Sequence, residues 1–198
     1  KGKGTAQREI KKLRTKVEHQ PNYCIHDVQY WLKNFFNPAV NPFLKLNNPN
    51  GKEIDLHLAT RLQNDYDDLK DSVHNEKIHL IPFSDDMGAL YSASDLIVSR
   101  AGALALSEMA LMGKAMVLVP FPYSAGDHQV KNAKAFSNSG AAILLPQSKL
   151  ESGELEATVL ELFRQPEKIR EMEEYSIQMA APDATENIIS TIMEIAKS

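Results

Sequence analysis

The amino-acid sequence predicts an α/β fold: a Rossmann-like parallel sheet with flanking helices. Short apolar runs of strand length alternate with segments of helical length from residue 51 onward. Two of these runs, 95–99 and 115–121, are nearly continuous in apolar residues, as expected for strands buried on both faces. Strands that alternate with helices indicate right-handed βαβ units, and therefore a parallel sheet.

The composition is that of an ordinary soluble globular protein, since 43% of the 198 residues are hydrophobic and 24% are charged. A net charge of -4 gives no electrostatic reason to expect nucleic acid as a partner. The single cysteine, Cys24, has no partner for an internal disulfide and fits a reducing cytosol. No apolar run approaches the ~20 residues that span a bilayer, and no signal-peptide pattern is found, so any membrane contact is expected at the surface.

Residues 1–50 are predicted to form an atypical amino-terminal segment of unknown role, irregular or helical, in front of a Rossmann-like domain at 51–198. Apolar residues at helical spacing predict a short, strongly basic helix over 5–19. Prolines interrupt residues 21–50, which also hold an aromatic cluster. The basic start either touches phosphate or anionic lipid, or is a solvated helix face or disordered arm. The aromatic cluster is either a docking surface or a small local core.

The elements of the domain follow in order from residue 51. Alternation predicts a strand at 54–58, helical spacing predicts a helix at 65–73, and a strand follows at 77–82. Asp85 or Asp86 caps a helix that runs to Ser94. The next elements are a strand at 95–99, a helix at 103–112 closed by Gly113, a strand at 115–121, a helix at 129–139 closed by Gly140, and a strand at 141–146. Two or three helices complete the chain, and the Asp183/Glu186 spacing before the last one resembles a capping box.

Polar residues and a glycine follow the buried strands, where a parallel sheet places its ligand pocket. In the segment Arg100-Ala101-Gly102-Ala103, the glycine lets a ligand approach the backbone, and the first N–H groups of the next helix can bind phosphate oxygens. The alternative is a tight turn between strand and helix that binds no ligand, which this segment would fit equally well. Glu108 lies among apolar neighbours in that helix, where a carboxylate is costly unless it is paired. A diol such as ribose would pair it; otherwise the side chain faces water.

A second polar group, Asp127, His128, Gln129 and Asn132, lies at the start of the helix at 129–139. Gln129 and Asn132 are three residues apart on one helix face, so both can hydrogen-bond neighbouring hydroxyls. Ordinary capping of the helix by Asp127 is the alternative. His128 beside an acid suggests a general base. However, no serine, cysteine or second histidine stands at triad spacing, and the other histidines lack the spacing of metal ligands. We therefore expect neither hydrolase chemistry nor a metal or other cofactor.

Six segments occur in a characteristic order: P-F-S-D-D-M, S-R-A-G-A-L-A-L-S-E, V-P-F-P, D-H-Q-x-x-N, G-A-A and A-P-D-A-T-E. Together they resemble the carboxyl-terminal half of the bacterial MurG family, the UDP-N-acetylglucosamine–N-acetylmuramyl-(pentapeptide) pyrophosphoryl-undecaprenol N-acetylglucosamine transferases. The resemblance extends from about Leu56 to the end of the chain. It implies the GT-B glycosyltransferase architecture, in which two Rossmann-like domains face each other across a cleft and the carboxyl-terminal one holds UDP-GlcNAc.

The resemblance also implies where the nucleotide would bind. Ser84 would read the uracil through its backbone, with Phe83 beside it and Met87 near the nucleotide. Glu108 would bind the ribose, in agreement with the argument from its need for a diol.

The pyrophosphate and sugar are assigned in the same way. Arg100 is a candidate substrate-binding residue at this turn, and Gly102, Ala103 and Leu104 would line the pyrophosphate and sugar through backbone groups. Gln129 and Asn132 would hold the GlcNAc hydroxyls, with His128 beside them. Ala105 replaces a threonine common in the family, so one side-chain hydrogen bond is expected to be missing.

The implied reaction is inverting transfer of GlcNAc from UDP to the C4 hydroxyl of the lipid-linked muramyl pentapeptide, lipid I, which gives lipid II in peptidoglycan synthesis. The leaving UDP would be stabilised by helix N-termini and backbone donors, without a metal ligand from the protein. The lipid-linked acceptor implies a cytoplasmic protein that is peripheral at the inner membrane.

Two parts of the family pattern are not found in residues 1–50: the amino-terminal acceptor domain with its glycine-rich histidine motif, and the G-G-S-x-G-A phosphate loop. The catalytic residues stay unassigned, with the general base expected in the absent amino-terminal domain. Three hypotheses are open. The chain is the donor-binding half of a peptidoglycan glycosyltransferase, a donor-binding subunit that needs a separate acceptor-binding chain, or a non-catalytic interaction domain with a vestigial pocket.

Overall fold

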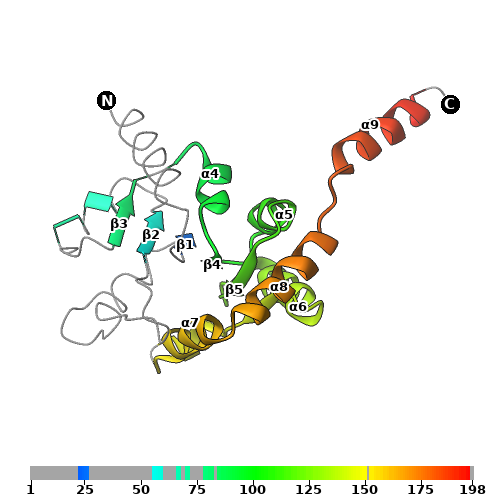
Figure 1. Cartoon of the computed structure of the whole chain (residues 1–198). Coiled ribbons are helices and arrows are strands. Elements are labelled where there is room, and N and C mark those ends of the chain that lie inside the picture. The colour runs from blue at the N-terminus through cyan, green and yellow to red at the C-terminus, as the bar shows by residue number, and fades with distance from the viewer. Residues whose placement is uncertain are drawn as a thin grey trace.

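The computed structural model describes residues 22–26, 55–59, 66–67, 70–71, 78–82, 84–150 and 152–196 (Figure 1). Its centre is a six-stranded sheet in the order β3-β2-β1-β4-β5-β6, in which every neighbouring pair is parallel. The strands are β1 (Asn22–His26), β2 (Asp55–Ala59), β3 (Ile78–Ile81), β4 (Leu96–Ser99), β5 (Ala115–Leu118) and β6 (Ala142–Leu144). This is the strand order of the Rossmann fold, so the predicted fold class is confirmed.

The direction in which the chain crosses the sheet reverses between the two central strands, β1 and β4. From β1 the order continues to β2 and β3 on one side, and from β4 it continues to β5 and β6 on the other. Open α/β sheets bind their ligands at such a reversal, just outside the carboxyl ends of the strands. The turn that contains Gly102 leaves β4 at this position.

The predicted boundary at residue 50 needs a correction, because β1 lies in the middle of the sheet. Residues Asn22–His26 pair in parallel with β2 on one side and with β4 on the other. The strand N-Y-C-I-H was missed because it is short, follows Pro21 and has polar residues at both ends, so no continuous apolar run marks it. The predicted helix at 5–19 and the aromatic cluster lie outside the described residues, as does most of the predicted helix at 65–73.

The described helices follow the strands in the predicted alternation. They are α4 (Met87–Ser92), α5 (Ala103–Leu111), α6 (His128–Asn138), α7 (Glu154–Arg164), α8 (Pro166–Gln178) and α9 (Ala184–Ile195), with 3₁₀ turns η2 (Ala125–Asp127) and η3 (Gln147–Lys149). Each predicted element from residue 77 to 146 is found within a few residues of its predicted ends. The strand predicted at 115–121 is shorter, since β5 ends at Leu118, two residues before Pro120.

The helix ends test the capping predictions directly. Asp86 caps α4, because its Oδ1 accepts a hydrogen bond from the Ala89 N–H at 2.9 Å. Gly113 and Gly140 follow α5 and α6 with φ angles of 61° and 89°, which confirms both as helix-closing glycines. The capping box predicted before the last helix is wrong: Asp183 is the N-cap residue of α9, but its side chain makes no capping hydrogen bond.

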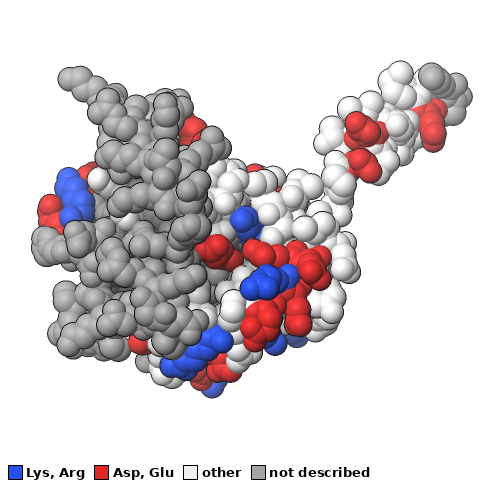
Figure 2. Space-filling model, viewed as in Figure 1, with Lys and Arg blue, Asp and Glu red and all other residues white. Residues whose placement is uncertain are grey.

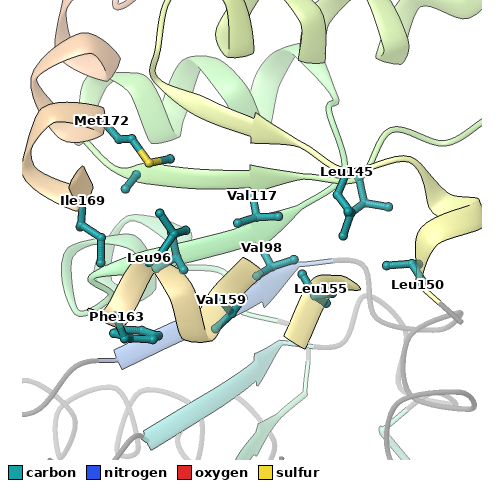
Figure 3. Close-up of a cluster of buried hydrophobic side chains, with 13 residues drawn as sticks. Leu96, Val98, Val117, Leu145, Leu150, Leu155, Val159, Phe163, Ile169 and Met172 are labelled. Atoms are coloured by element: carbon teal, nitrogen blue, oxygen red, sulfur yellow. The ribbon is translucent and has the colours of Figure 1, made fainter. Parts of the chain in front are cut away.

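The core lies on both faces of the sheet, because alternate residues of each strand point to opposite sides. On one face, Leu96, Val98 and Val117 pack against apolar residues of α7 and α8 (Figure 3). On the other face, Ile97 and Met116 pack against a cluster contributed mainly by α4, α5 and α6. The result is a three-layer α/β/α domain, and this arrangement fixes the ends of β4 and β5 rigidly.

The last helix differs from the others, since no residue of α9 is buried. Figure 1 shows α9 running away from the body of the domain beyond α8. Its large apolar residues are 52–69% exposed, namely Ile188, Ile189, Ile192, Met193 and Ile195. Among the described helices, none combines the length and the apolar character needed to cross a bilayer.

Candidate functional site

Four chain segments leave the sheet at the carboxyl ends of β3, β4, β5 and β6. Because all the strands are parallel, these ends meet at one edge of the sheet. The segment after β3 holds Ser84, the segment after β4 holds Arg100 and Gly102, and the segment after β5 leads to Gln129. The structure thus gathers the predicted site residues along this carboxyl edge; Phe83 lies outside the described residues.

The β3–α4 turn is held by its own side chains. Ser84 is buried, and its Oγ accepts a hydrogen bond from the Asp86 N–H at 3.2 Å. Asp86 in turn caps α4, whose first residue is the half-buried Met87. These contacts fix the backbone at Ser84, which is the group that the sequence comparison with the MurG family assigns to the uracil.

The β4–α5 turn leaves space around its glycine. Gly102 is the N-cap residue of α5, with φ -70° and ψ 138°, and no side chain caps this helix. A Cβ at Gly102 would meet no atom within 4 Å. Ala103 and Leu104 are exposed, the latter at 76%. The first N–H groups of a helix lack intrahelical partners and carry the positive end of its dipole, so this end of α5 is suited to an anion.

Glu108 lies on α5, six residues after Gly102 and therefore about 9 Å along the helix axis. Its neighbours Leu106 and Met109 are buried, whereas Glu108 is half-buried. Within the described part of the chain, its carboxylate has no hydrogen-bond or ion-pair partner. The Cα–Cβ bonds of a helix tilt toward its N-terminus, which for α5 is the Gly102 end. An unpaired acceptor at this place suits a ligand with hydroxyl donors.

The β5–α6 loop turns sharply before α6. Gly126 and Asp127 both have left-handed backbone angles, with φ of 58° and 57°, and Asp127 is a non-glycine residue in this region. The side chain of Asp127 makes no capping hydrogen bond, so the alternative of ordinary helix capping is not realised. The exposed His128 instead closes the turn, with Nδ1 2.7 Å from the Ala125 carbonyl oxygen. A neutral ring therefore carries its proton on Nδ1 and leaves Nε2 as the acceptor.

The two amides on α6 have their orientations set by protein partners. The Oε1 of Gln129 accepts a hydrogen bond from the Phe121 N–H at 2.9 Å, which leaves the Nε2 group to donate. The Nδ2 of Asn132 donates to the Ala101 carbonyl at 3.1 Å, which leaves Oδ1 to accept. Gln129 and Asn132 thus offer one donor and one acceptor side by side. The Asn132 bond also ties α6 to the residue before Gly102, so the two halves of the site are joined.

Arg100 is placed differently from what the sequence suggests, because its side chain is buried inside the domain. Its Nη1 donates to the Val119 carbonyl at 3.2 Å and to Oε1 of Gln147 at 2.7 Å. The guanidinium carbon also lies 5.6 Å from the centre of the Phe121 ring. Phe121 and Gln147 were not recognised in the sequence; a V-P-F-P segment directly after a buried strand was the available signal for the first.

For metal ligands, the described ranges contain no group of three or more His, Cys, Asp or Glu residues that could hold an ion. The polar groups of the carboxyl edge are instead amides, one carboxylate and backbone N–H groups. Such a set binds hydroxyls and phosphate oxygens directly.

Comparison with known proteins identifies the family. The model of the "Glycosyltransferase family 28 C-terminal domain" matches residues 32–188. The chain belongs to this family. Its matched region begins after β1 and runs from before β2 into the first turn of α9, so the candidate site residues described above lie inside it.

Two curated relatives share the name UDP-N-acetylglucosamine–N-acetylmuramyl-(pentapeptide) pyrophosphoryl-undecaprenol N-acetylglucosamine transferase. The protein of Stutzerimonas stutzeri is 42% identical over 115 residues, which are 58% of this chain and 32% of the relative. That of Chlorobium limicola is 40% identical over 134 residues, which are 67% of this chain and 37% of the relative. The chain therefore aligns with about a third of the length of these relatives.

The structural comparison agrees with this assignment. The crystal structure of MurG from Acinetobacter baumannii is similar with a TM-score of 0.68 and 29% sequence identity, covering 90% of this chain and 53% of that one. A UDP-GlcNAc 2-epimerase from Neisseria meningitidis is similar in fold alone, with a TM-score of 0.63 and 17% identity over 96% of this chain and 49% of that one. The domain has the fold of one half of a GT-B glycosyltransferase.

Proposed function

We propose that this chain binds UDP-N-acetylglucosamine at its carboxyl edge and forms the donor-binding half of a peptidoglycan glycosyltransferase. The observation that carries the proposal is the open N-terminus of α5 at the reversal of strand order, with Glu108 on the same helix and Asn132 bonded to Ala101, the residue before Gly102. The names of the relatives support the same donor.

The chemistry of each group fits one part of the donor. The N–H groups after Gly102 suit the pyrophosphate, because they combine free donors with the positive end of a helix dipole. Glu108 suits the ribose diol, since a carboxylate accepts from two hydroxyls. The donor of Gln129 and the acceptor of Asn132 suit sugar hydroxyls, which do both. Ser84 and Met87 are left for the base, at the end of the site nearest β3.

In the proposed reaction, the acceptor C4 hydroxyl oxygen attacks C1 of GlcNAc while the bond from C1 to the UDP oxygen breaks, with inversion at C1. The negative charge that develops on UDP would be stabilised by the α5 N-terminus, because fixed donors need no reorganisation as charge develops. The hydroxyl proton passes to a general base. We assign that base to the portion of the relatives that this sequence does not cover.

The same proposal includes partner and location. The acceptor named in the relatives is a muramyl pentapeptide on undecaprenyl pyrophosphate, which is a membrane lipid. We therefore propose that the chain works as a peripheral protein at the cytoplasmic face of the bacterial inner membrane.

A second candidate function is a donor-binding subunit whose acceptor is held by a separate chain. Two exposed apolar side chains, Leu104 at 76% at the start of α5 and Tyr123 at 83% in the β5–α6 loop, support a covering body of either origin. A second body that covers these residues would complete the site in either case. The two candidates differ only in whether the acceptor-binding body belongs to the same chain.

Calorimetric titration with UDP and UDP-GlcNAc tests the proposal, followed by a transfer assay with a lipid I analogue. Glu108→Ala should weaken UDP binding about 10–100-fold, because hydrogen bonds to a charged acceptor contribute about 1.5–3 kcal/mol. Glu171→Ala, at an exposed acidic position on α8, is the matched control and should bind like the parent chain. Absence of binding to both ligands would refute the proposal. Binding without transfer by this sequence alone would agree with both forms, because the general base lies outside it in each.

A further inference from the structure

Arg100 is a charged side chain in a place where charge is costly unless it is well paired. It follows β4 directly and is only 9% exposed. Two of its acceptors are known: the carbonyl of Val119, which follows β5, and the amide oxygen of Gln147, which opens η3 after β6. One guanidinium therefore joins the chain at the carboxyl ends of three neighbouring strands.

Backbone hydrogen bonds already join these strand ends, and the guanidinium adds side-chain hydrogen bonds to them. The Val119 N–H donates to the Ser99 carbonyl at 2.9 Å, and the Leu145 N–H donates to the Leu118 carbonyl at 2.9 Å. Beyond Val119 no strand pairing continues, because β5 ends and Pro120 has no N–H to donate. Arg100 thus acts where the regular hydrogen bonding of the sheet stops.

The guanidinium also contacts the next part of the loop through an aromatic ring. Its carbon lies 5.6 Å from the centre of the Phe121 ring, within the range of a cation–π interaction. The same residue, Phe121, donates its N–H to Oε1 of Gln129. A contact on the ring and a hydrogen bond on the backbone of one residue therefore connect Arg100 to the Gln129 amide.

We infer that Arg100 is a positioning residue that does not contact the ligand. Its contacts with Val119 and Phe121 hold these residues in place, and Phe121 in turn fixes the Gln129 amide with Nε2 toward the donor sugar. The identity of the ligand rests on the proposed function, whereas the positioning of Phe121 by Arg100 does not. This assignment differs from the one that the sequence comparison gave, in which Arg100 was a substrate-binding residue.

A measurement without ligand tests whether Arg100 holds Phe121 in place. Arg100→Lys keeps the charge but cannot reach two acceptors and cover a ring together. In this variant, hydrogen exchange at the Phe121 amide, followed by NMR, should be about tenfold faster, as in a local opening. Arg164→Lys, at an exposed position in the last turn of α7, is the matched control and should leave it unchanged. An unchanged rate in Arg100→Lys would overturn the inference.

A measurement with ligand separates positioning from direct contact. If Arg100 acts through Gln129, Arg100→Lys should weaken UDP-GlcNAc binding about tenfold while UDP binding stays within about twofold, and it should add nothing in a Gln129→Ala background. Equal losses for UDP and UDP-GlcNAc would show a direct contact with the nucleotide and overturn the inference.

Two further variants keep the test decisive if Arg100→Lys does not fold. Phe121→Leu removes the half-exposed ring and retains the backbone N–H, and Gln147→Ala removes one acceptor of the guanidinium. Both should speed exchange at the amide of residue 121, and neither doing so would count against the inference. If the parent chain binds neither nucleotide, the proposed function fails, while the exchange experiment still decides the role of Arg100.

Discussion

The glycines at the carboxyl ends of the strands and those at the amino ends have different structural roles. At the carboxyl edge, Gly102 has ordinary extended backbone angles and open space where a Cβ would stand. At the amino edge, Gly113 and Gly140 precede β5 and β6 with positive φ angles, and their surfaces lie against α8. A Cβ at these two positions would lie 2.7 Å from Cγ1 of Ile177 and 2.8 Å from Cδ2 of Tyr175.

The polar groups of the two edges differ in the same way. At the amino edge, Lys114 donates through Nζ to the Ser94 carbonyl at 2.9 Å, and the Ser94 hydroxyl donates to the Leu90 carbonyl at 2.8 Å. These groups satisfy the end of α4 from within the protein. At the carboxyl edge, and among the described residues, the N-terminus of α5 has no side-chain cap, and Glu108 further along the same helix keeps an unpaired carboxylate. The comparison teaches that one edge holds the fold together while the other is available to a ligand.

The largest effect should come from filling the space at the amino edge. Gly140→Ala combines a φ of 89° with a clash against a ring. The left-handed backbone costs about 1–2 kcal/mol and the overpacking adds about 1–3 kcal/mol, so we expect a loss of roughly 2–5 kcal/mol. Thermal unfolding should show a Tm lower by about 5–15 °C. Nucleotide affinity of the folded fraction should not change.

Gly153→Ala separates the two causes. Gly153 has a φ of 76°, but a Cβ there would meet nothing within 4 Å. Gly153→Ala should therefore lose only the stability that the left-handed backbone costs, about 1–2 kcal/mol. If both variants lose the same stability, packing against Tyr175 contributes nothing and the description of the amino edge is incorrect.

A smaller effect, and on binding instead of stability, is expected from Gly102→Ala. The backbone angles suit alanine and the space is free, so unfolding free energy should change by less than about 1 kcal/mol, the cost of alanine at an N-cap. A methyl group would keep the pyrophosphate from the helix N-terminus, so UDP-GlcNAc affinity should fall on the order of tenfold, or about 1.4 kcal/mol. Unchanged affinity with unchanged Tm would show that the pyrophosphate does not bind at this turn.

The smallest effect concerns pH. Glu173 is half-buried on α8, the helix over which acidic side chains gather in Figure 2. Burial raises the pKa of its carboxyl, Asp95 raises it further, and Lys114 and Arg170 oppose the rise. Because the folded pKa lies above the unfolded one, the folded state binds more protons, and stability is lost as the pH rises through the folded pKa.

Glu173→Gln removes this dependence. The variant and the parent should be equally stable near pH 4, where the carboxyl is protonated. At pH 7 the variant should be more stable by no more than a few tenths of a kcal/mol, because solvent screens a half-exposed group. Urea denaturation at both pH values measures the difference. A variant that is less stable at pH 7 would mean that the contact with Lys114 outweighs burial.

Local signals in the sequence predicted the central elements correctly. β4 and β5 are marked by apolar runs buried on both faces, and α5 and α6 by the glycines that close them. β1 was missed because a five-residue strand with polar ends carries no such run. The carboxylate, the two amides and the glycine turn were singled out as site candidates in the same way as the strands, from the chemistry of adjacent residues, and their roles stay predictions.

Non-local contacts were beyond the reach of the sequence. The bond between Arg100 and Gln147 joins residues 47 positions apart, and the one between Asn132 and Ala101 joins residues 31 positions apart. Neither pair has a spacing that indicates contact, because the sheet brings them together only once β4, β5 and β6 are in register. This is why Arg100 was assigned to the ligand although its side chain faces the interior.

The isolated position of α9 has a thermodynamic consequence. A helix of 12 residues with no buried side chain is marginal in water, because nucleation costs more than so few turns return. Any contact that buried the isoleucine face, which includes Ile188 and Ile192, would therefore increase its helicity. If that face were covered, the folding of α9 and the burial of its isoleucines would form a single equilibrium, so amide exchange in α9 would report the covered fraction.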